Sequence, residues 1–324
     1  MGAVAASSEA LGDGGRNSGK SNCLLRPEVT TVELFELISA EEGNYSIALM
    51  CEVLQVSRSG FYDWKKRSES DRARRRRELG NLIEEFFDAS EQTYGYRRIH
   101  ADLIFSGHAV DDDTVRSIMR ERGLVPCQPA PKRPVTTIAA DAGDLPDLVR
   151  RDFVAVDVGA KLVGDITYIK TWEGWLYLAT VLDCYSKKAV GYATSDRMTA
   201  ELVCEALDMA AANVPFTFGE TIFHSDRGGQ YMSEEFARCA RRHGVRRSVG
   251  RTGVCYDNAW AESFNGTLKN ECVNRKVYDT RKRARKDVLR YIELRYNTKR
   301  RHSALDYQAP NDVESEWFIR NRAA

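Results

Sequence analysis

Three carboxylates that lie far apart along the chain have the residue types and surroundings of a site for divalent cations. Asp165 lies inside an apolar, β-branched run, Asp226 follows a short apolar segment, and thirty-five residues separate Asp226 from Glu262. A charge in the core of a strand is costly to bury unless it is paired or binds a metal. Carboxylate oxygens are hard ligands that suit Mg²⁺ or Mn²⁺ better than zinc, and paired ions of this kind serve phosphoryl transfer without a covalent protein nucleophile. The alternative is that these carboxylates lie on the surface or cap helices.

Other side chains compete for a chemical role in the same region. Asp157, Asp183 and Asp257 are nearby in sequence; we interpret Asp257 as a helix cap and Asp183 as a strand-end residue. Ser225 has the chemistry of a recombinase nucleophile, but nothing in its sequence context supports that role. The metal-binding prediction therefore stays with the first three acids.

Polar side chains on a predicted helix over residues 257–273 share a face with Glu262. Asn258 lies four residues before this acid, Asn265 three after it and Lys269 seven after it. Residues at these separations are neighbours on a helix surface. A carboxylate followed by amide and ammonium groups could hold a metal and the flanking DNA phosphates together. A solvated helix face is the alternative.

The segments that must position these residues follow the order of a ribonuclease H-like α/β fold. Residues 162–170, 175–183 and 187–194 are predicted strands, and their short connections indicate an antiparallel meander. Alternation places Asp165 beside Thr167 on one face of the first strand. The later segments are helix 199–213, strand 221–224, helix 233–243, strand 245–249 and helices 257–273 and 281–296. We therefore predict a mixed five-stranded sheet with helices on both faces, in a catalytic core over residues 151–275.

Small all-α regions are predicted in front of this core. Residues 31–90 have helical apolar spacing, and Ser57 is a plausible N-cap for a short helix that follows a tight corner. The helices around that corner resemble a helix-turn-helix, with Arg58 and Lys65 available for DNA. A small helical bundle with a solvated basic end is the alternative. The arginine run at 74–77 either contacts phosphate or is a solvated face.

The remaining segments complete the domain organisation. Residues 91–125 form a second helix-turn-helix-like region, although the acidic run at 111–113 favours a helix N-terminus over a DNA groove. Residues 126–150 hold five of the eight prolines within 21 residues, which predicts an extended linker. Residues 1–30 are expected to be disordered or to follow a start codon placed too far upstream. Residues 276–324 are expected to form a basic helical extension.

Charge is distributed unevenly along the chain. The net charge is only +1 over 324 residues, but residues 241–301 hold 18 lysines and arginines against 6 aspartates and glutamates. This excess surrounds Glu262 and would attract a polyanion. The eight cysteines have wide, irregular spacing without a CxxC pair, which argues against a zinc site and favours a reducing compartment. No apolar run has the length of a membrane span, and no signal peptide is apparent, so we expect a cytoplasmic, nucleoid-associated protein.

Several motifs together resemble the DDE transposase and retroviral-integrase superfamily. Residues 224–231 (HSDRGGQY), 257–271 (DNAWAESFNGTLKNE) and 165–169 (DITYI) carry this resemblance, with the thirty-five-residue spacing between the second and third acids. The most similar family is the second-frame protein (OrfB) of insertion sequences in the IS-three group. The tail at 296–305 and the front segments at 56–62 and 94–99 also resemble that group. The resemblance covers roughly residues 32–313.

The resemblance implies a ribonuclease H-like core in which Asp165, Asp226 and Glu262 hold two Mg²⁺ ions, with Mn²⁺ as a substitute. Such enzymes cut DNA at the ends of an element with water and then join the freed 3′ hydroxyl to another phosphodiester. Lys269 matches a position that contacts element DNA in integrases, and Asn265 a neighbouring polar position. The predicted DNA contacts are Asn258, Asn265, Lys269, Arg58, Lys65 and, in the terminal motif, Arg300 and Arg301.

The implied partners are the terminal inverted repeats of the element, target DNA, further copies of the chain in a synaptic complex and the upstream first-frame protein. Leu162 and the Val158–Ala160 segment depart from the residues usual in the group before the first acid, which raises a question about local packing there. Two rival functions are a non-catalytic helix-turn-helix regulator of DNA and a ribonuclease H-like nuclease that cuts without joining.

Overall fold

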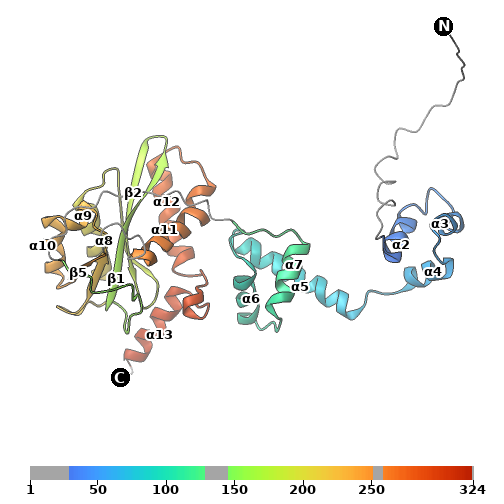
Figure 1. Ribbon diagram of the computed structural model, residues 1–324, viewed down its shortest axis with the longest axis horizontal. Coiled ribbons are helices and arrows are strands. Elements are labelled where there is room, and N and C mark those ends of the chain that lie inside the picture. The colour runs from blue at the N-terminus through green and yellow to red at the C-terminus, as the bar shows by residue number, and fades with distance from the viewer. Residues whose placement is uncertain (1–28, 128–144, 251–257, 323–324) are drawn as a thin grey trace, which may run out of the picture. The chain divides into compact units, whose positions relative to one another are not determined.

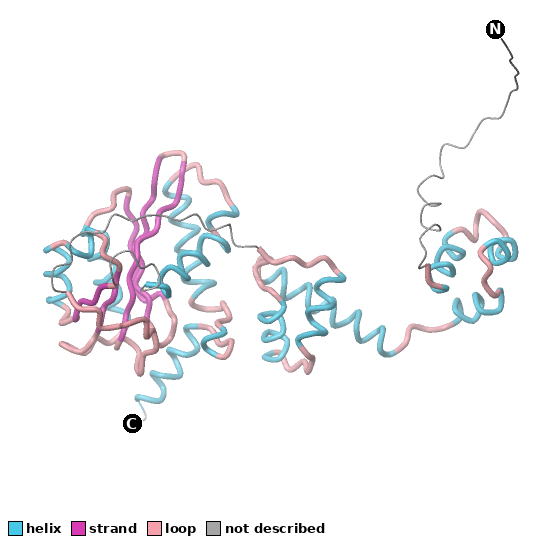
Figure 2. The backbone as a smooth tube through the Cα atoms, viewed as in Figure 1, coloured by secondary structure: helices cyan, strands magenta, loops and turns pink. Residues whose placement is uncertain are grey.

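The computed structural model describes residues 29–127, 145–250 and 258–322 of the chain (Figures 1 and 2). Two compact units divide between Glu78 and Leu79. The expectations for residues 1–28, for the middle of the proline-rich segment and for Asp257 concern residues outside these described ranges. Within the described ranges, no helix has both the length and the apolar character needed to cross a membrane.

The first unit contains three short helices, as predicted: α2 (Thr31–Ala40), α3 (Ile47–Val53) and α4 (Arg58–Lys66). Ser57 caps α4, because its side chain accepts a hydrogen bond from the amide of Gly60 at 3.2 Å. The helices bury one small cluster, made of Phe35, Ile38, Cys51 and Phe61.

The second unit begins within α5 (Asp71–Ala89) and continues with α6 (Tyr96–Phe105) and α7 (Asp112–Glu121). Asp111 caps α7 by accepting from the amide of Thr114 at 2.7 Å, so the acidic run lies at a helix N-terminus as predicted. From Leu79 onward α5 packs with the other two helices. The buried apolar residues of this cluster are Ile83, Phe87, Tyr94, Ile99, Leu103, Val115, Ile118 and Met119.

A five-stranded sheet of order β3-β2-β1-β4-β5 forms the centre of the second unit (Figure 1). The strands are β1 (Lys161–Thr171), β2 (Gly174–Asp183), β3 (Ala189–Ser195), β4 (Ile222–Ser225) and β5 (Arg246–Val249). β1, β2 and β3 form an antiparallel meander, whereas β1, β4 and β5 run parallel. The prediction of a mixed, ribonuclease H-like sheet is confirmed, and each strand ends within two residues of its predicted position.

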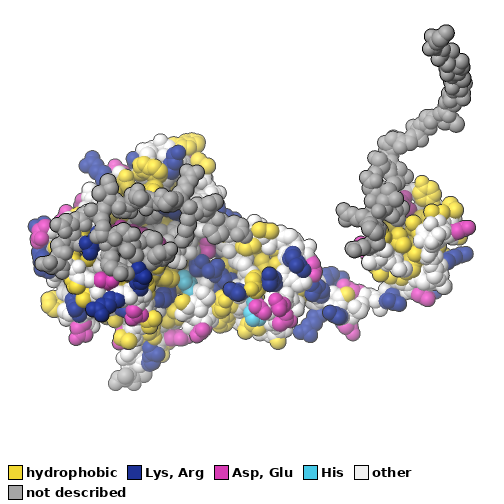
Figure 3. Space-filling view, in the orientation of Figure 1, with side chains coloured by type: hydrophobic (Ala, Val, Ile, Leu, Met, Phe, Trp, Pro, Cys, Tyr) yellow, Lys and Arg dark blue, Asp and Glu magenta, His cyan; other side chains and the backbone are white. Residues whose placement is uncertain are grey.

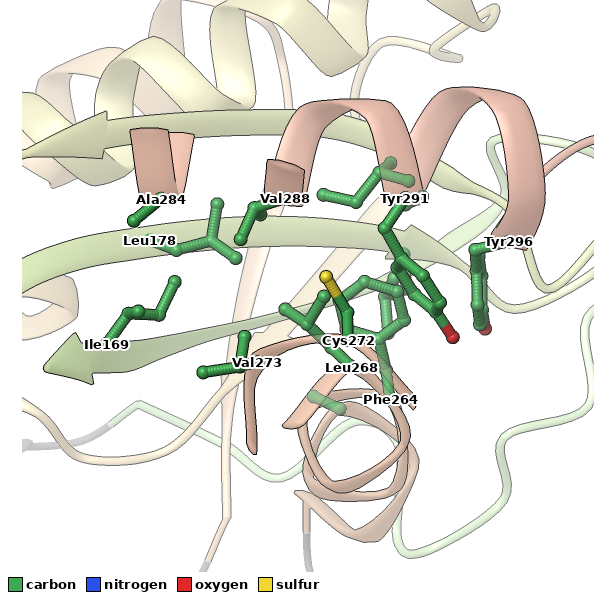
Figure 4. Packing of buried hydrophobic residues seen from close by; sticks show 14 of the residues in the cluster. Ile169, Leu178, Phe264, Leu268, Cys272, Val273, Ala284, Val288, Tyr291 and Tyr296 are labelled. Atoms are coloured by element: carbon green, nitrogen blue, oxygen red, sulfur yellow. The ribbon is translucent and has the colours of Figure 1, made fainter. Parts of the chain in front are cut away.

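Helices cover both faces of this sheet. The helices after β3 are α8 (Ala200–Asn213), α9 (Gly229–Met232), α10 (Glu234–Arg242), α11 (Ala259–Glu271), α12 (Arg281–Tyr291) and α13 (Pro310–Arg322). On one face, α11 and α12 bury Phe264, Leu268 and Val288 against Ile169 and Leu178 of the sheet (Figure 4). On the other face, α8 and α10 bury an equivalent cluster that includes Leu207, Phe236, Leu162 and Phe223.

The predicted helix 281–296 changes character near its end. α12 is followed by a π-helical segment, Ile292–Tyr296. Next to it, Asn297 is fully buried, and its side chain accepts from the amide of Ala189 at 3.0 Å and donates to the carbonyl of the same residue at 3.1 Å. These two bonds fix the chain after the π-turn to the first residue of β3.

The departures from the family pattern at the start of β1 and just before it are well packed. Leu162 is fully buried, and the amide of Gly159 donates to the Asp183 carboxylate at 3.0 Å. Gly159 has φ of +79°, and a Cβ atom there would lie 2.0 Å from the carbonyl oxygen of Pro215. Only glycine fits this close approach of two backbones.

β1 and β2 form a hairpin that extends past the other three strands (Figures 1 and 2). β4 pairs with β1 only over Lys161–Val163. From Gly164 onward, the edge of β1 on the β4 side therefore has no strand partner among the described residues. This open edge, beside the end of β4, is where an α/β sheet offers room for a ligand.

Candidate active site

The three predicted acids line one cavity at the open edge of β1. Asp165 belongs to β1, Asp226 follows β4, and Glu262 lies in the first turn of α11. The cavity has a volume of about 760 Å³, which is within the range of ligand-binding clefts. The fold therefore brings together carboxylates from three separate elements, as the sequence predicted.

Asp165 is held by two hydrogen bonds. Its carboxylate accepts from the amide of Ile166 and from the side-chain amide of Asn265, each at 2.8 Å. Burial, the negative charge of Asp226 and, to a smaller extent, that of Glu262 together raise the pKa of Asp165 to about 7, although the two hydrogen bonds act in the opposite direction. Because these carboxylates repel one another in a poorly solvated cavity, bound cations would relieve the repulsion.

Asp226 is oriented by the loop that follows β4. Its carboxylate accepts from the amide of Gly228 at 3.0 Å, and burial raises its pKa. The buried His224 side chain, two residues earlier, lies 2.8 Å from the Ser248 hydroxyl of β5. The end of β4 is thus anchored to its neighbouring strand, which fixes the start of the loop that carries Asp226.

Asn258 anchors the start of α11 to the open edge of β1. Its side-chain amide donates to the carbonyl of Gly164 at 3.1 Å, and the residue is only 6% exposed. A buried carbonyl on an unpaired strand edge needs such a partner. This buried side chain positions the helix that carries Glu262, and a contact of Asn258 with DNA stays a prediction.

Asn265 and Lys269 line the cavity beside Glu262, so the predicted face of α11 is present. Asn265 is used to hold Asp165. The Lys269 ammonium lies 4.7 Å from the centroid of the Tyr168 ring. Burial lowers the pKa of Lys269, while the nearby Asp165 charge opposes that shift. Lys269 therefore offers a positive charge at the rim of the acidic cavity.

Arg300 and Arg301 of the terminal motif are paired with acids of the second unit. Arg300 is 6% exposed and forms a bidentate ion pair with Glu271 at 2.8 and 3.0 Å. Arg301 donates to Asp102 of α6 at 2.7 Å, and its guanidinium lies 4.3 Å from the Phe105 ring centroid. These pairs hold the tail against α11 and α6, and contact of the two arginines with DNA stays a prediction.

The two predicted DNA contacts of the first unit are exposed. Arg58 is the first residue of α4, and Lys65 near its end forms an ion pair with Glu42. Arg74 and Arg75 are exposed on the part of α5 that belongs to the same unit, where Figure 3 shows Lys and Arg side chains gathered. None of these four side chains is buried.

The competing acids have structural roles. Asp183 is fully buried and accepts from the amide and hydroxyl of Ser186, each at 2.7 Å. Asp157 accepts from the indole of Trp317 at 2.8 Å. The interpretation of Asp183 as a strand-end residue is confirmed, because it is the last residue of β2.

The spacing of the acids bears on the kind of metal site they could form. Within the described ranges, one set of three metal-ligating side chains has its ligand atoms within 4.8 Å of one another, namely Asp208, Cys239 and His243. There, Asp208 is already paired with Arg242 and His243, each at 2.6 Å. Among the described residues, the ligand oxygens of Asp165, Asp226 and Glu262 do not all lie within 4.8 Å of one another.

Aromatic side chains at the site were missed from the sequence. Tyr168, Trp175 and Tyr177 line the cavity together with Gln230 and Tyr231. The signal was available in the alternation of the hairpin, because Trp175 and Tyr177 are two residues apart and Tyr168 pairs with Tyr177 across the strands.

Known families match three stretches of the chain. An Integrase core domain matches residues 156–255, a second Integrase core domain matches residues 243–310, and an HTH-like domain matches residues 74–133. The last stretch contains α6, α7 and all but the first three residues of α5. The integrase-core matches include all three cavity acids.

Relatives match almost from end to end. The transposase InsF for insertion sequence IS3A of Escherichia coli strain K12 is 37% identical over 87% of this chain and 98% of its own length. A 31 kDa protein of insertion element IS600 from Shigella sonnei is 38% identical over 81% of this chain and 96% of its own length.

A solved structure, the HTLV-2 integrase catalytic core domain in complex with magnesium, is 16% identical over 49% of this chain and 99% of that chain, with a TM-score of 0.39. The identity to the IS3 relatives over nearly their whole length, with the integrase-core and HTH-like matches, establishes the family. The chain belongs to the transposases of the IS3 group of insertion sequences, which are polynucleotidyl transferases of the DDE type.

Proposed function

We propose that this transposase cuts DNA at the ends of its element and joins the freed 3′ ends to target DNA, with Asp165, Asp226 and Glu262 as ligands for two Mg²⁺ ions. The observation that carries this proposal is the convergence of the three carboxylates on one cavity at the open edge of β1. The donors are hard oxygens, which fit Mg²⁺ or Mn²⁺.

The groups around the three acids have separate roles in this proposal. When bound, the ions would activate the attacking oxygen and stabilise the leaving oxygen of the phosphodiester. Asn265 and the amide of Ile166 orient Asp165, and the amide of Gly228 orients Asp226. Lys269 supplies a positive charge for a phosphate that flanks the reacting bond.

DNA is the proposed partner on two grounds, charge and exposure. Basic residues outnumber acidic ones 18 to 6 between positions 241 and 301. Arg58, Lys65 and the exposed arginines of α5 could hold the backbone of the terminal inverted repeats. Joining two ends to one target requires more than one copy of the chain, and we include the upstream first-frame protein as a further partner. Such an enzyme would work on the chromosome, in the nucleoid.

Asp226→Asn tests the metal-binding role. The substitution keeps the side-chain size and the acceptor for Gly228 but removes a charged ligand, so we expect cleavage and strand transfer to fall by about 10³-fold or more, while DNA binding persists. Asp208→Asn, an exposed acid outside the cavity, is the matched control and should retain activity. Undiminished transposition by Asp226→Asn would discard the proposal and favour a DNA-binding regulator.

A second assay separates a transposase from a plain nuclease. Labelled oligonucleotides that carry the element ends are incubated with the enzyme and Mg²⁺, and the products are resolved by length. We expect both shortened strands and longer joined strands. Cutting without any joined product would support the nuclease alternative.

A further inference from the structure

Two aromatic side chains, Tyr168 of β1 and Trp175 of β2, form an exposed pair at the wall of the acidic cavity. Their ring centroids lie 5.1 Å apart in an edge-to-face arrangement, and each residue is 45% exposed. Both line the same cavity as the catalytic acids. We refer to Tyr168 and Trp175 as the aromatic pair.

The fold does not need these rings for its core. Leu176 and Leu178, which alternate with Trp175 along β2, are fully buried and fill the core on the opposite face. The register pairs Lys170 with Trp175 and Tyr168 with Tyr177, so the aromatic pair lies on the other face of the hairpin. Since aromatic side chains gain most when buried, two half-exposed rings in a cavity indicate a surface that a ligand covers.

The surroundings of the aromatic pair identify the chemistry of that ligand. The Lys269 ammonium lies 4.7 Å from the Tyr168 ring centroid, and the carboxylates lie further along the same cavity. A flat apolar ring beside a fixed cation matches a nucleotide, which offers a base to stack and a phosphate to neutralise. Inside a duplex both faces of a base are covered by neighbouring bases. Only an unpaired or terminal base presents a free face.

We infer that the aromatic pair is a stacking subsite for unpaired nucleobases at the end of the DNA substrate, next to the catalytic acids. This inference rests on the proposed function in one respect, namely that DNA enters the acidic cavity. Stacking on aromatic side chains is tolerant of sequence, so the subsite would hold frayed ends of any composition. The subsite would keep the two DNA strands apart at the end of the duplex while the reacting phosphodiester lies next to Asp165, Asp226 and Glu262.

Binding measured without divalent cations tests the subsite separately from catalysis. The probes are a fluorescent hairpin duplex with a blunt end and the same duplex with three unpaired thymidines at its 3′ end. The full chain should bind the tailed probe about tenfold more tightly than the blunt probe, as expected when stacking contributes about 1–3 kcal/mol per base. The double variant Tyr168→Leu/Trp175→Leu should bind both probes equally.

Matched variants separate stacking from folding. Trp172→Leu removes a 78% exposed indole from the turn of the same hairpin, outside the cavity lining, and should keep the tail preference. Tyr168→Phe keeps the aromatic ring and should also keep the preference for the tailed probe. If 2-aminopurine replaces one thymidine of the tail, its fluorescence should change on binding to the wild type and to Trp172→Leu, but not on binding to the double variant.

The inference is overturned if the wild type shows no preference for the tailed probe, or if the double variant keeps that preference. Neither outcome depends on cleavage. A failure of the metal-binding proposal would appear only in the Asp226→Asn activity assay, so the two failures are distinguishable.

Discussion

Asn265 connects the helix that carries Glu262 to the carboxylate of Asp165. Its hydrogen bond to Asp165, at 2.8 Å, fixes the direction in which that carboxylate faces the cavity. The residue is itself only 7% exposed, so the role that we propose for it in the DNA reaction is to position an acid.

We expect Asn265→Ala to slow strand transfer by about 10- to 100-fold, because a hydrogen bond to a charged group contributes about 1.5–3 kcal/mol. The Mg²⁺ concentration for half-maximal activity should rise as well, since the carboxylate is less well oriented. Thr267→Ala, on the same helix and outside the cavity lining, is the control. A wild-type rate and Mg²⁺ dependence in Asn265→Ala would remove this positioning role.

His302 is a buried histidine that should make the fold sensitive to acid. Burial and, to a smaller extent, the positive charges of Arg300, Arg98 and Lys187 together lower its pKa to about 3. An unfolded chain protonates the histidine near its ordinary pKa, whereas the folded protein keeps it neutral. Its contribution to stability is therefore complete above the unfolded pKa and is lost as the pH falls below it.

At pH 5 this loss should amount to about 2 kcal/mol relative to pH 7.5. His302→Phe keeps the aromatic contacts with Tyr296 and Trp260 but cannot be protonated. When urea unfolding is measured at both pH values, the stability lost between pH 7.5 and pH 5 should be about 2 kcal/mol smaller for the variant than for the wild type. Equal losses in the two proteins would mean that His302 is protonated in the folded state.

At the scale of elements, the C-terminal end of α11 is tied to the tail by a buried ion pair. Glu271 accepts from Arg300 and also from the Tyr291 hydroxyl at 2.7 Å. Burial would raise the pKa of Glu271, but the Arg300 charge and these hydrogen bonds hold it below its ordinary value. The same helix carries Glu262 near its other end, so this pair fixes the axis of the catalytic helix.

Arg300→Met should destabilise the protein by about 3–5 kcal/mol, because it leaves Glu271 buried without its main counter-charge. Adding Glu271→Gln should recover part of the loss. Arg241→Met, which breaks the exposed pair with Glu234, is the control and should cost about 1 kcal/mol or less. The midpoint of denaturant unfolding is measured for the wild type, the two single variants and the double variant. A loss for Arg300→Met no larger than for Arg241→Met would show that solvent reaches the pair.

The sequence predicted the elements better than it predicted which side chains they use. Strand positions followed from apolar alternation, and the three acids followed from strand and helix signals that are local. Asn258 and Arg300 were expected to contact DNA, yet their partners are Gly164 and Glu271, which no periodicity relates to them. The alternation of the hairpin places the aromatic pair on one face, but it does not reveal that β1 loses its neighbour β4 after Val163, and so the pair was not assigned to the cavity.

At the scale of the whole molecule, the second unit, which carries the three cavity acids, contains helices that precede the sheet as well as the sheet itself. The predicted division at residue 90 separates α5 from the helices that follow it. In the structure, the half of α5 from Leu79 onward buries Ile83 and Phe87 with α6 and α7, and the unit boundary falls between Glu78 and Leu79. The HTH-like match, which begins at residue 74, includes the same packed half of α5.

Two truncations that differ only in this half-helix distinguish the two boundaries. A chain that begins at Leu79 keeps all three apolar clusters of the second unit, because no residue of α5 before Leu79 is buried. This chain should therefore unfold cooperatively, at the same temperature as the second unit of the full chain. A chain that begins at Ser90 loses Ile83 and Phe87 from the cluster around α6 and α7. Removal of one buried Phe side chain costs about 3–5 kcal/mol, so these helices should lose their structure. Circular dichroism melts and amide exchange of α6 and α7 measure both effects. Protected α6 and α7 amides in the shorter chain would place the boundary at residue 90 after all.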